Sequence, residues 1–159
     1  MPFCPLPITA LTSDDAPALV ALQAACFDSG GTWSAESWTT SLNLPTSRGA
    51  GIREDDLIRG VILAQVTEDE AEILTLAVHP TARRHGLGAA LVRHLVTVFA
   101  PNRRIHLEVA ADNIAAQGLY ERCGFVRSGL RPGYYRRSEG PVDAWLYTSP
   151  GSPETPRGS

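Results

Sequence analysis

The stretch Leu76-Ala-Val-His-Pro-Thr-Ala-Arg-Arg-His-Gly-Leu-Gly88 decides the fold, because an apolar strand, a basic glycine loop and a helix start follow one another within it. The first turn of a helix leaves backbone N–H groups without partners and carries the positive end of the helix dipole, so it suits a phosphate or pyrophosphate. Gly86 and Gly88 remove side chains that would block an anion's approach. Arg83 and Arg84 add positive charge. The stretch therefore predicts a site for a phosphorylated ligand.

The hydrophobic pattern on either side of this stretch predicts alternating helices and strands. Strands are expected over residues 6–11, 48–53, 57–66, 71–78, 105–109, 125–130 and 142–148, the last two around a turn at 131–141. Helices are expected from a Ser13 cap to about Phe27, from a Ser34 cap to before Pro45, from Gly86 to about Phe99, and from an Asp112 or Asn113 cap to Gly124. The third helix has apolar residues spaced so that they lie on one helix face: Leu87, Leu91, Leu95 and Val98.

Two of the expected strands differ in pattern. Residues 73–78 are almost all apolar, which indicates a strand buried on both faces. Residues 105–109 alternate cleanly, which puts His106 and Glu108 together on the less apolar face. The chain of 159 residues is expected to form a single domain over residues 1–148, and the Pro-, Gly- and Ser-rich residues 149–159 are expected to be disordered.

Composition narrows the class of protein. A hydrophobic fraction of 43% is ordinary for a soluble globular chain, and a net charge of −3 argues against a nucleic-acid-binding surface spread over the molecule. Cys4, Cys26 and Cys123 are odd in number and lack C-x-x-C spacing, so free thiols in a reducing cytoplasm are expected. We see neither a signal peptide nor an apolar run of about 18 residues, and expect no membrane contact. The histidines lack metal-ligand spacing, so no metal is expected.

The glycine loop allows more than one interpretation. A P-loop is excluded, because no Gly-Lys-Ser/Thr follows at the required spacing. A dinucleotide-binding fingerprint is disfavoured, since Leu91 stands at the third glycine position and the glycines lie eight residues beyond Val78. A pyrophosphate loop of the form Arg-x-x-Gly-x-Gly is met by Arg83, Gly86 and Gly88. An ordinary strand-to-helix connection with two convenient glycines also stays open.

These residues resemble a known family. The segment Arg83-Arg-His-Gly-Leu-Gly88, directly after Leu-Ala-Val-His-Pro, resembles motif A of the GNAT superfamily of N-acetyltransferases. The segment Leu107-Glu-Val-Ala-Ala-Asp-Asn-Ile-Ala-Ala-Gln-Gly-Leu-Tyr-Glu-Arg-Cys-Gly-Phe125 resembles the RimI-type branch, the ribosomal-protein-alanine N-acetyltransferases. Gly133-Tyr-Tyr135, Asp143-Ala144 and Trp33-Ser34 continue the likeness, which covers most of residues 6–148.

The resemblance implies a fold and a donor. The expected fold is α/β, with a mixed, mostly antiparallel sheet split at its centre and helices on both faces. Acetyl-CoA is expected as co-substrate, with its pyrophosphate on the N–H groups of residues 84–89 and its pantetheine arm beside residues 76–78. Asn113 is expected to touch the donor, although capping a helix explains it equally well. The residues expected to bind acetyl-CoA are Leu76, Ala77, Val78, Arg83, Arg84, His85, Gly86, Leu87, Gly88, Ala89 and Asn113.

The same resemblance assigns the chemistry. Glu108 is the expected general base, because an attacking amine must lose a proton, and Tyr120 is the expected general acid for the departing thiolate. From the residues alone, Glu108 also fits a solvated glutamate and Tyr120 a core aromatic. Trp33, Tyr134 and Tyr135 are expected to line the acceptor side.

The expected reaction is acetyl transfer from acetyl-CoA to the N-terminal α-amine of a protein, the N-terminal alanine of a small-subunit ribosomal protein, by a cytoplasmic monomer that does not bind nucleic acid. Three alternatives stay open: a small-molecule amine acetyltransferase, a non-catalytic acetyl-CoA-binding regulatory module, and a dinucleotide-binding module. The Glu108 and Tyr120 pair argues against the regulatory module, because a protein that only binds the donor has no use for an acid and a base.

Overall fold

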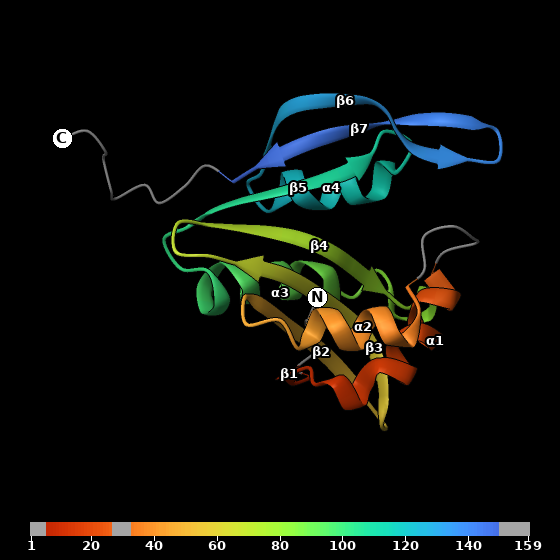
Figure 1. Cartoon of the computed structure of the whole chain (residues 1–159), viewed down its shortest axis with the longest axis vertical. Coiled ribbons are helices and arrows are strands. Elements are labelled where there is room, and N and C mark those ends of the chain that lie inside the picture. The colour runs from red at the N-terminus through yellow and green to blue at the C-terminus, as the bar shows by residue number, and fades with distance from the viewer. Residues whose placement is uncertain (1–5, 27–32, 150–159) are drawn as a thin grey trace.

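The computed structural model describes residues 6–26 and 33–149. In these residues seven strands form one sheet in the order β1-β2-β3-β4-β5-β7-β6 (Figure 1). The strands are β1 (Ile8–Ala10), β2 (Ser47–Glu54), β3 (Leu57–Val66), β4 (Glu70–Val78), β5 (Arg104–Ala110), β6 (Val126–Arg137) and β7 (Gly140–Thr148). The helices are α1 (Ala16–Cys26), α2 (Ala35–Leu42), α3 (Leu87–His94) and α4 (Ile114–Arg122), with short helical turns η1 (Ser13–Asp15), η2 (Pro80–Ala82) and η3 (Leu95–Phe99).

The sheet divides between β4 and β5. Every other neighbouring pair of strands is antiparallel, whereas β4 and β5 run parallel and pair only where Glu70–Glu72 face Arg104–His106. In β4 the register against β3 shifts so that Leu74 is an extra residue, a bulge that bends the strand just beyond this short pairing. The mixed, mostly antiparallel sheet with a central split is therefore confirmed.

The split also changes the burial of β4. No residue from Ile73 to Val78 is exposed, but Leu74, Thr75, Leu76 and Val78 are only half-buried. The expectation of a strand fully buried on both faces is wrong here, because the departing β5 leaves one edge of β4 without a covering strand.

Helices cover both faces of the sheet, as expected (Figure 1). Successive residues of a strand point to opposite faces, so Val61 and Ile62 of β3 belong to two different cores. One core joins β3 and β4 to α1 and α2 through Leu19, Leu22 and Trp38. The other joins the sheet to α3 and α4 through Leu91, Leu95 and Tyr120. The two helix pairs therefore cover opposite faces of the sheet.

Two helix details differ from the expectations. Ser13 is not the cap of α1, because the Asp15 carboxylate accepts from the Thr12 N–H at 2.9 Å and a 3₁₀ turn begins one residue earlier than expected. Val98 is 57% exposed, although Leu95 is fully buried. The last helical turn widens to a π-turn, with the Ala100 N–H bonded to the Leu95 carbonyl at 2.8 Å, and this widening rotates Val98 away from the core.

The β6–β7 hairpin is longer than expected. The turn expected at 131–141 is wrong, because β6 continues to Arg137 and β7 begins at Gly140. Pro132 and Gly133, which signal a turn, instead form a bulge between Arg131 and Tyr135. Gly133 has φ +63, and its N–H donates to the Asp143 carboxylate at 2.8 Å. The two strands pair again beyond this bulge, so the tyrosine pair is carried on a strand.

Other local expectations are confirmed. Ser34 caps α2 by accepting from the Ser37 N–H at 3.0 Å, and Asn113 caps α4 by accepting from the Ala116 N–H at 3.1 Å. Gly124 ends α4 with φ +95. Cys4, Phe27, the glycine pair at 30–31 and residues 150–159 lie outside the described residues. In the part of the chain that is described, no helix is long and apolar enough to cross a membrane.

Candidate active site

The edge of β4 that faces the split carries backbone groups that do not pair with β3. The His79 N–H donates to the Arg59 carbonyl at 2.8 Å, so His79 and Arg59 form a hydrogen-bonded pair of the antiparallel β3–β4 ladder. Such pairs alternate along a ladder, so Leu76 and Val78 turn their N–H and C=O groups away from β3, towards the split. An extended ligand can pair with this edge as an added strand.

The loop between β4 and α3 presents a row of donors. Arg84 and Gly86 have φ +70 and +79, left-handed positions that tilt successive N–H groups into one concavity. Among the described residues, no N–H from Arg84 to Ala89 has a hydrogen-bond acceptor. These donors stand at the positive end of the α3 dipole. The loop therefore fits a pyrophosphate, the diphosphate group of acetyl-CoA.

Two contacts shape the loop from outside. The Arg83 Nε donates to the Val78 carbonyl at 3.0 Å, so this side chain fastens the loop to the end of β4. A Cβ on Gly88 would lie 3.0 Å from a methyl carbon of Leu119, so a larger residue would press on Leu119 where α3 approaches α4. His85, Leu87 and Ala89 complete the segment, with the Leu87 side chain buried in the core.

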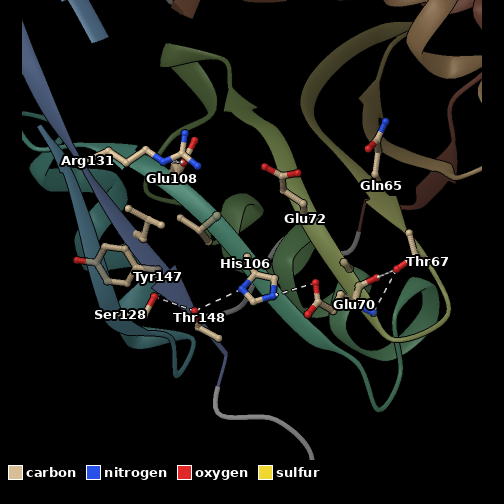
Figure 2. Close-up of a pocket in the computed structure, with 13 residues that line it drawn as sticks. Gln65, Thr67, Glu70, Glu72, His106, Glu108, Ser128, Arg131, Tyr147 and Thr148 are labelled. Carbon is tan, nitrogen blue, oxygen red and sulfur yellow. Dashed lines mark hydrogen bonds and ion pairs between the residues drawn. The ribbon is translucent and has the colours of Figure 1, made fainter. Parts of the chain in front are cut away.

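Glu108 stands across the split from the free edge of β4. Its side chain is 17% exposed, and its Oε2 accepts from the Arg131 Nε at 2.9 Å. The Arg131 guanidinium also lies over the Tyr134 ring, 5.1 Å from the ring centroid. The neighbouring Glu108 carboxylate raises the pKa of Tyr134. Figure 2 shows Arg131 reaching from β6 over Glu108.

Tyr120 lies beneath the split on α4 and is 6% exposed. Its ring packs 5.8 Å from Phe125 and 6.4 Å from Tyr147, measured between centroids. Burial raises the pKa of Tyr120 well above its ordinary value, and Cys123 and Tyr135 add to this effect. The phenol therefore keeps its proton at neutral pH.

Tyr135 lies against Glu108 and Tyr134. Its hydroxyl donates to the Glu108 backbone carbonyl at 3.4 Å, and its ring is 5.0 Å from that of Tyr134. Burial, followed by the Glu108 charge, raises the pKa of Tyr135. The α4 helix is fixed to the end of β5 by Gln117, whose amide donates to the Ala110 and Ala111 carbonyls at 3.1 and 3.0 Å.

The comparisons with known proteins agree with this geometry. The sequence matches the acetyltransferase (GNAT) family over residues 16–125. The chain belongs to the GNAT family. It is 35% identical over 138 residues to the N-alpha-acetyltransferase RimI of Mycobacterium tuberculosis, covering 84% of this chain and 87% of that relative. It is 37% identical over 98 residues to the [ribosomal protein bS18]-alanine N-acetyltransferase of Salmonella typhimurium, covering 60% of this chain and 66% of that relative.

Solved structures show the same fold. The ribosomal-protein-S18-alanine N-acetyltransferase of Escherichia coli superposes with a TM-score of 0.83 at 27% identity, over 96% of this chain and 99% of that one. Arabidopsis thaliana NAA60, solved with acetyl-CoA, superposes with a TM-score of 0.76 at 20% identity, over 90% of this chain and 97% of that one. This likeness shows a common fold. The expected RimI-type membership of the GNAT family is confirmed.

The structure of this GNAT acetyltransferase brings some of the expected site residues together and separates others. Glu108, Tyr120, Tyr134 and Tyr135 gather on one side of the split, and the loop with residues 76–78 forms the other. Trp33 packs against Trp38 at 4.8 Å between centroids, in the core beneath α1 and α2.

Sequence reasoning missed Arg131 and Glu72. Arg131 lies in a segment expected to be a turn, so nothing placed it beside Glu108. The sequence did contain a pattern that indicates Glu72, because side chains alternate along a strand and Glu70-Ala-Glu72 therefore puts both carboxylates on one face of β4. Both line a cavity of about 320 Å³ beside Glu108, which we call the acidic groove (Figure 2). Its lining residues with a carboxylate, imidazole or guanidinium group are Glu70, Glu72, His106, Glu108 and Arg131.

Proposed function

We propose that this enzyme transfers the acetyl group of acetyl-CoA to the N-terminal α-amine of a protein, the N-terminal alanine of ribosomal protein bS18. The observation that carries the proposal is the placement of Glu108 across the split from the free backbone edge of Leu76 and Val78. The names of its M. tuberculosis and S. typhimurium relatives support an α-amine as acceptor, and the second of them supports alanine. We further propose a cytoplasmic monomer that acts without a metal or nucleic acid.

The chain's own backbone would hold the donor. The N–H groups of residues 84–89 would bind the pyrophosphate, and the backbone groups of Leu76 together with the Val78 N–H would pair with the pantetheine arm. Acetyl-CoA supplies an activated acyl group as a thioester. The Val78 N–H would donate to the oxygen of that acyl group as negative charge develops on it during attack. Asn113 completes the proposed donor-binding set, together with its role as helix cap.

Two side chains would move the protons. An α-ammonium has a reference pKa of about 7.7–8.0, and Glu108 would take its proton directly or through one water. The free amine then attacks the acyl carbon, so no acetyl-enzyme forms. Tyr120, which stays protonated, would donate its proton to the departing thiolate sulfur. The products are an acetylated N-terminus and coenzyme A. We propose that Trp33, Tyr134 and Tyr135 contact the acceptor peptide.

Intact-mass detection with acetyl-CoA tests the proposal. The pool contains a peptide with a free N-terminal alanine, the same peptide with a blocked N-terminus and an internal lysine, and spermidine. An acetyl mass shift confined to the free-alanine peptide is the expected result. Acetylation of spermidine or of lysine alone would move the substrate class to small amines or side chains. Donor binding without any acetylation of a peptide corresponding to the bS18 N-terminus would favour a regulatory module.

A further inference from the structure

A buried glutamine precedes the proposed acid by one helical turn on α4. Gln117 is 5% exposed, and its side chain makes three hydrogen bonds. The Nε2 atom donates to the carbonyl oxygens of Ala110 and Ala111, and the Oε1 atom accepts from the Arg127 guanidinium at 2.8 Å. Burying an amide costs free energy unless its polar atoms are bonded, and here both ends of the amide have partners. Gln117 therefore joins α4 to the end of β5 and to the start of β6.

These partners select glutamine at this position. A carbonyl oxygen can only accept and a guanidinium can only donate, so the Gln117 amide has one orientation that satisfies all three bonds. A glutamate of the same length would place a carboxylate oxygen against two carbonyl oxygens. A methionine of similar length would offer them no donor and would offer Arg127 no good acceptor. Hydrogen bonding, beyond packing alone, therefore accounts for a glutamine here.

Arg127 extends the bonding back to the same helix face. Its Nε donates to the Tyr147 hydroxyl at 3.0 Å, and that hydroxyl donates to the Glu121 carboxylate at 2.7 Å. The Arg127 guanidinium also lies 4.1 Å from the centroid of the Trp145 ring. Glu121 follows Gln117 by four residues, so both lie on one face of α4. Two successive turns of α4 are therefore tied to the β6–β7 hairpin.

Tyr120 lies between these two attachments. The Tyr147 ring, whose hydroxyl belongs to the network, packs 6.4 Å from the Tyr120 ring between centroids. At the other end, Ala110 follows Glu108 by two residues on β5. The bonds of Gln117 therefore set the helix that carries the proposed acid against the strand that carries the proposed base. A displacement of about 1 Å between reacting groups can cost about 10²-fold in rate.

We propose that Gln117 is a positioning residue, which holds α4 against the end of β5 so that the Tyr120 hydroxyl meets the departing thiolate sulfur. The inference rests on the proposed function, because it takes Tyr120 to be the general acid. In this role Gln117 acts through Tyr120 alone. Its loss should therefore lower kcat and leave the Kd for acetyl-CoA and the KM for the peptide unchanged.

A double-mutant cycle tests the proposal. It compares kcat for an alanine-initiated peptide in the wild type, Gln117→Met, Tyr120→Phe and the variant that carries both changes. Gln117→Met should lower kcat about tenfold, because a displaced acid loses part of the effect that Tyr120→Phe removes entirely. In the Tyr120→Phe background the same change should have no further effect on kcat, because no hydroxyl is left to position.

Two further variants keep the test independent of folding. Arg127 is partly exposed, so Arg127→Gln removes the partner of the Gln117 oxygen without a change in the core. It should lower kcat less than Gln117→Met does, and again only while the Tyr120 hydroxyl is present. If Gln117→Met does not fold, this second cycle decides in the same way. Leu19→Ala is the control for stability, since Leu19 is fully buried in the core on the other face of the sheet. It should lower the thermal midpoint and leave kcat unchanged.

Each other outcome overturns the inference in a recognisable way. Unchanged kcat in a folded Gln117→Met variant, or an equal fold-loss with and without the Tyr120 hydroxyl, removes the positioning role. The same loss of kcat in Leu19→Ala assigns the effect to stability. Full turnover in Tyr120→Phe leaves α-amine acetylation standing but gives Gln117 no acid to position. If the wild type acetylates no peptide while acetyl-CoA binds, the proposed function itself fails and the inference fails with it.

Discussion

The two sides of the split are built in different ways. The donor side is continuous in sequence, from Leu76 to Ala89, and it presents backbone N–H groups arranged by two left-handed residues and a helix start. The acceptor side comes from β4, β5 and the β6–β7 hairpin, and it presents side chains held by ion pairs and aromatic contacts. Backbone donors suit a constant ligand, whereas side chains can change one at a time. The difference predicts that donor binding and acceptor use respond to separate substitutions.

The largest effect is expected for Glu108→Gln. Removing the proposed general base should lower kcat by about 10²- to 10⁴-fold, while the Kd for acetyl-CoA stays unchanged, because the proposed donor contacts lie across the split. Steady-state kinetics and calorimetry measure the two quantities. Arg131→Gln is the control for the lost ion pair. An equal loss of kcat in both variants would show that the pair matters and that proton transfer by Glu108 does not.

Tyr120→Phe tests the proposed general acid, which lies on the same side of the split as Glu108. The change removes only the hydroxyl from a packed ring, so kcat should fall by about 10²-fold with little change in acetyl-CoA binding. The measurement is kcat at neutral pH, with the thermal midpoint as a check on folding. Unchanged turnover in a folded variant would leave Tyr120 as a core aromatic and remove it from the mechanism.

A smaller effect is expected on the donor side. Gly86 has φ +79, with nothing within 4 Å of a Cβ built there, so Gly86→Val strains the loop without filling a neighbour's space. A strain of about 1–2 kcal/mol should raise the Kd for acetyl-CoA about tenfold and leave the acceptor KM unchanged. Gly124→Val is a matched control, since Gly124 has φ +95 and equally open surroundings away from the loop. Equal donor affinity in both variants would contradict the role of the loop.

Sequence patterns predicted the donor side of the split better than the acceptor side. The donor loop, its strand and its helix are local, so residue spacing alone indicated them. The acceptor side depends on contacts across the fold: the Arg131–Glu108 pair forms only because β6 continues through its bulge, and Glu72 meets the groove only because β4 and β5 run side by side. A Pro-Gly pair favours a turn, yet pairing with β7 overrides this preference. No local sequence pattern indicates that pairing with β7 outweighs the turn preference of the Pro-Gly pair.

The smallest expected effect concerns Tyr120 at alkaline pH. Its folded pKa is raised above the value near 10 that an exposed tyrosine has, so the folded state holds the proton more tightly than the unfolded chain does. The stability contributed by the protonated phenol is complete below about pH 10, and it is lost as the pH rises towards the folded pKa. Tyr120→Phe should therefore show a shallower fall in the free energy of unfolding between about pH 9 and 11 than the wild type, measured by urea denaturation.

Tyr134→Phe is the control for this last measurement. The pKa of Tyr134 is also raised, but on an exposed ring and chiefly by a hydrogen bond to Glu108, with the Glu108 charge second, so its removal should change the slope less than removal of Tyr120 does. If the Tyr120→Phe slope equals that of the wild type, burial does not hold the proton on Tyr120. A smaller alkaline slope together with reduced turnover would instead show that the burial which stabilises the core also keeps the proposed acid, Tyr120, protonated.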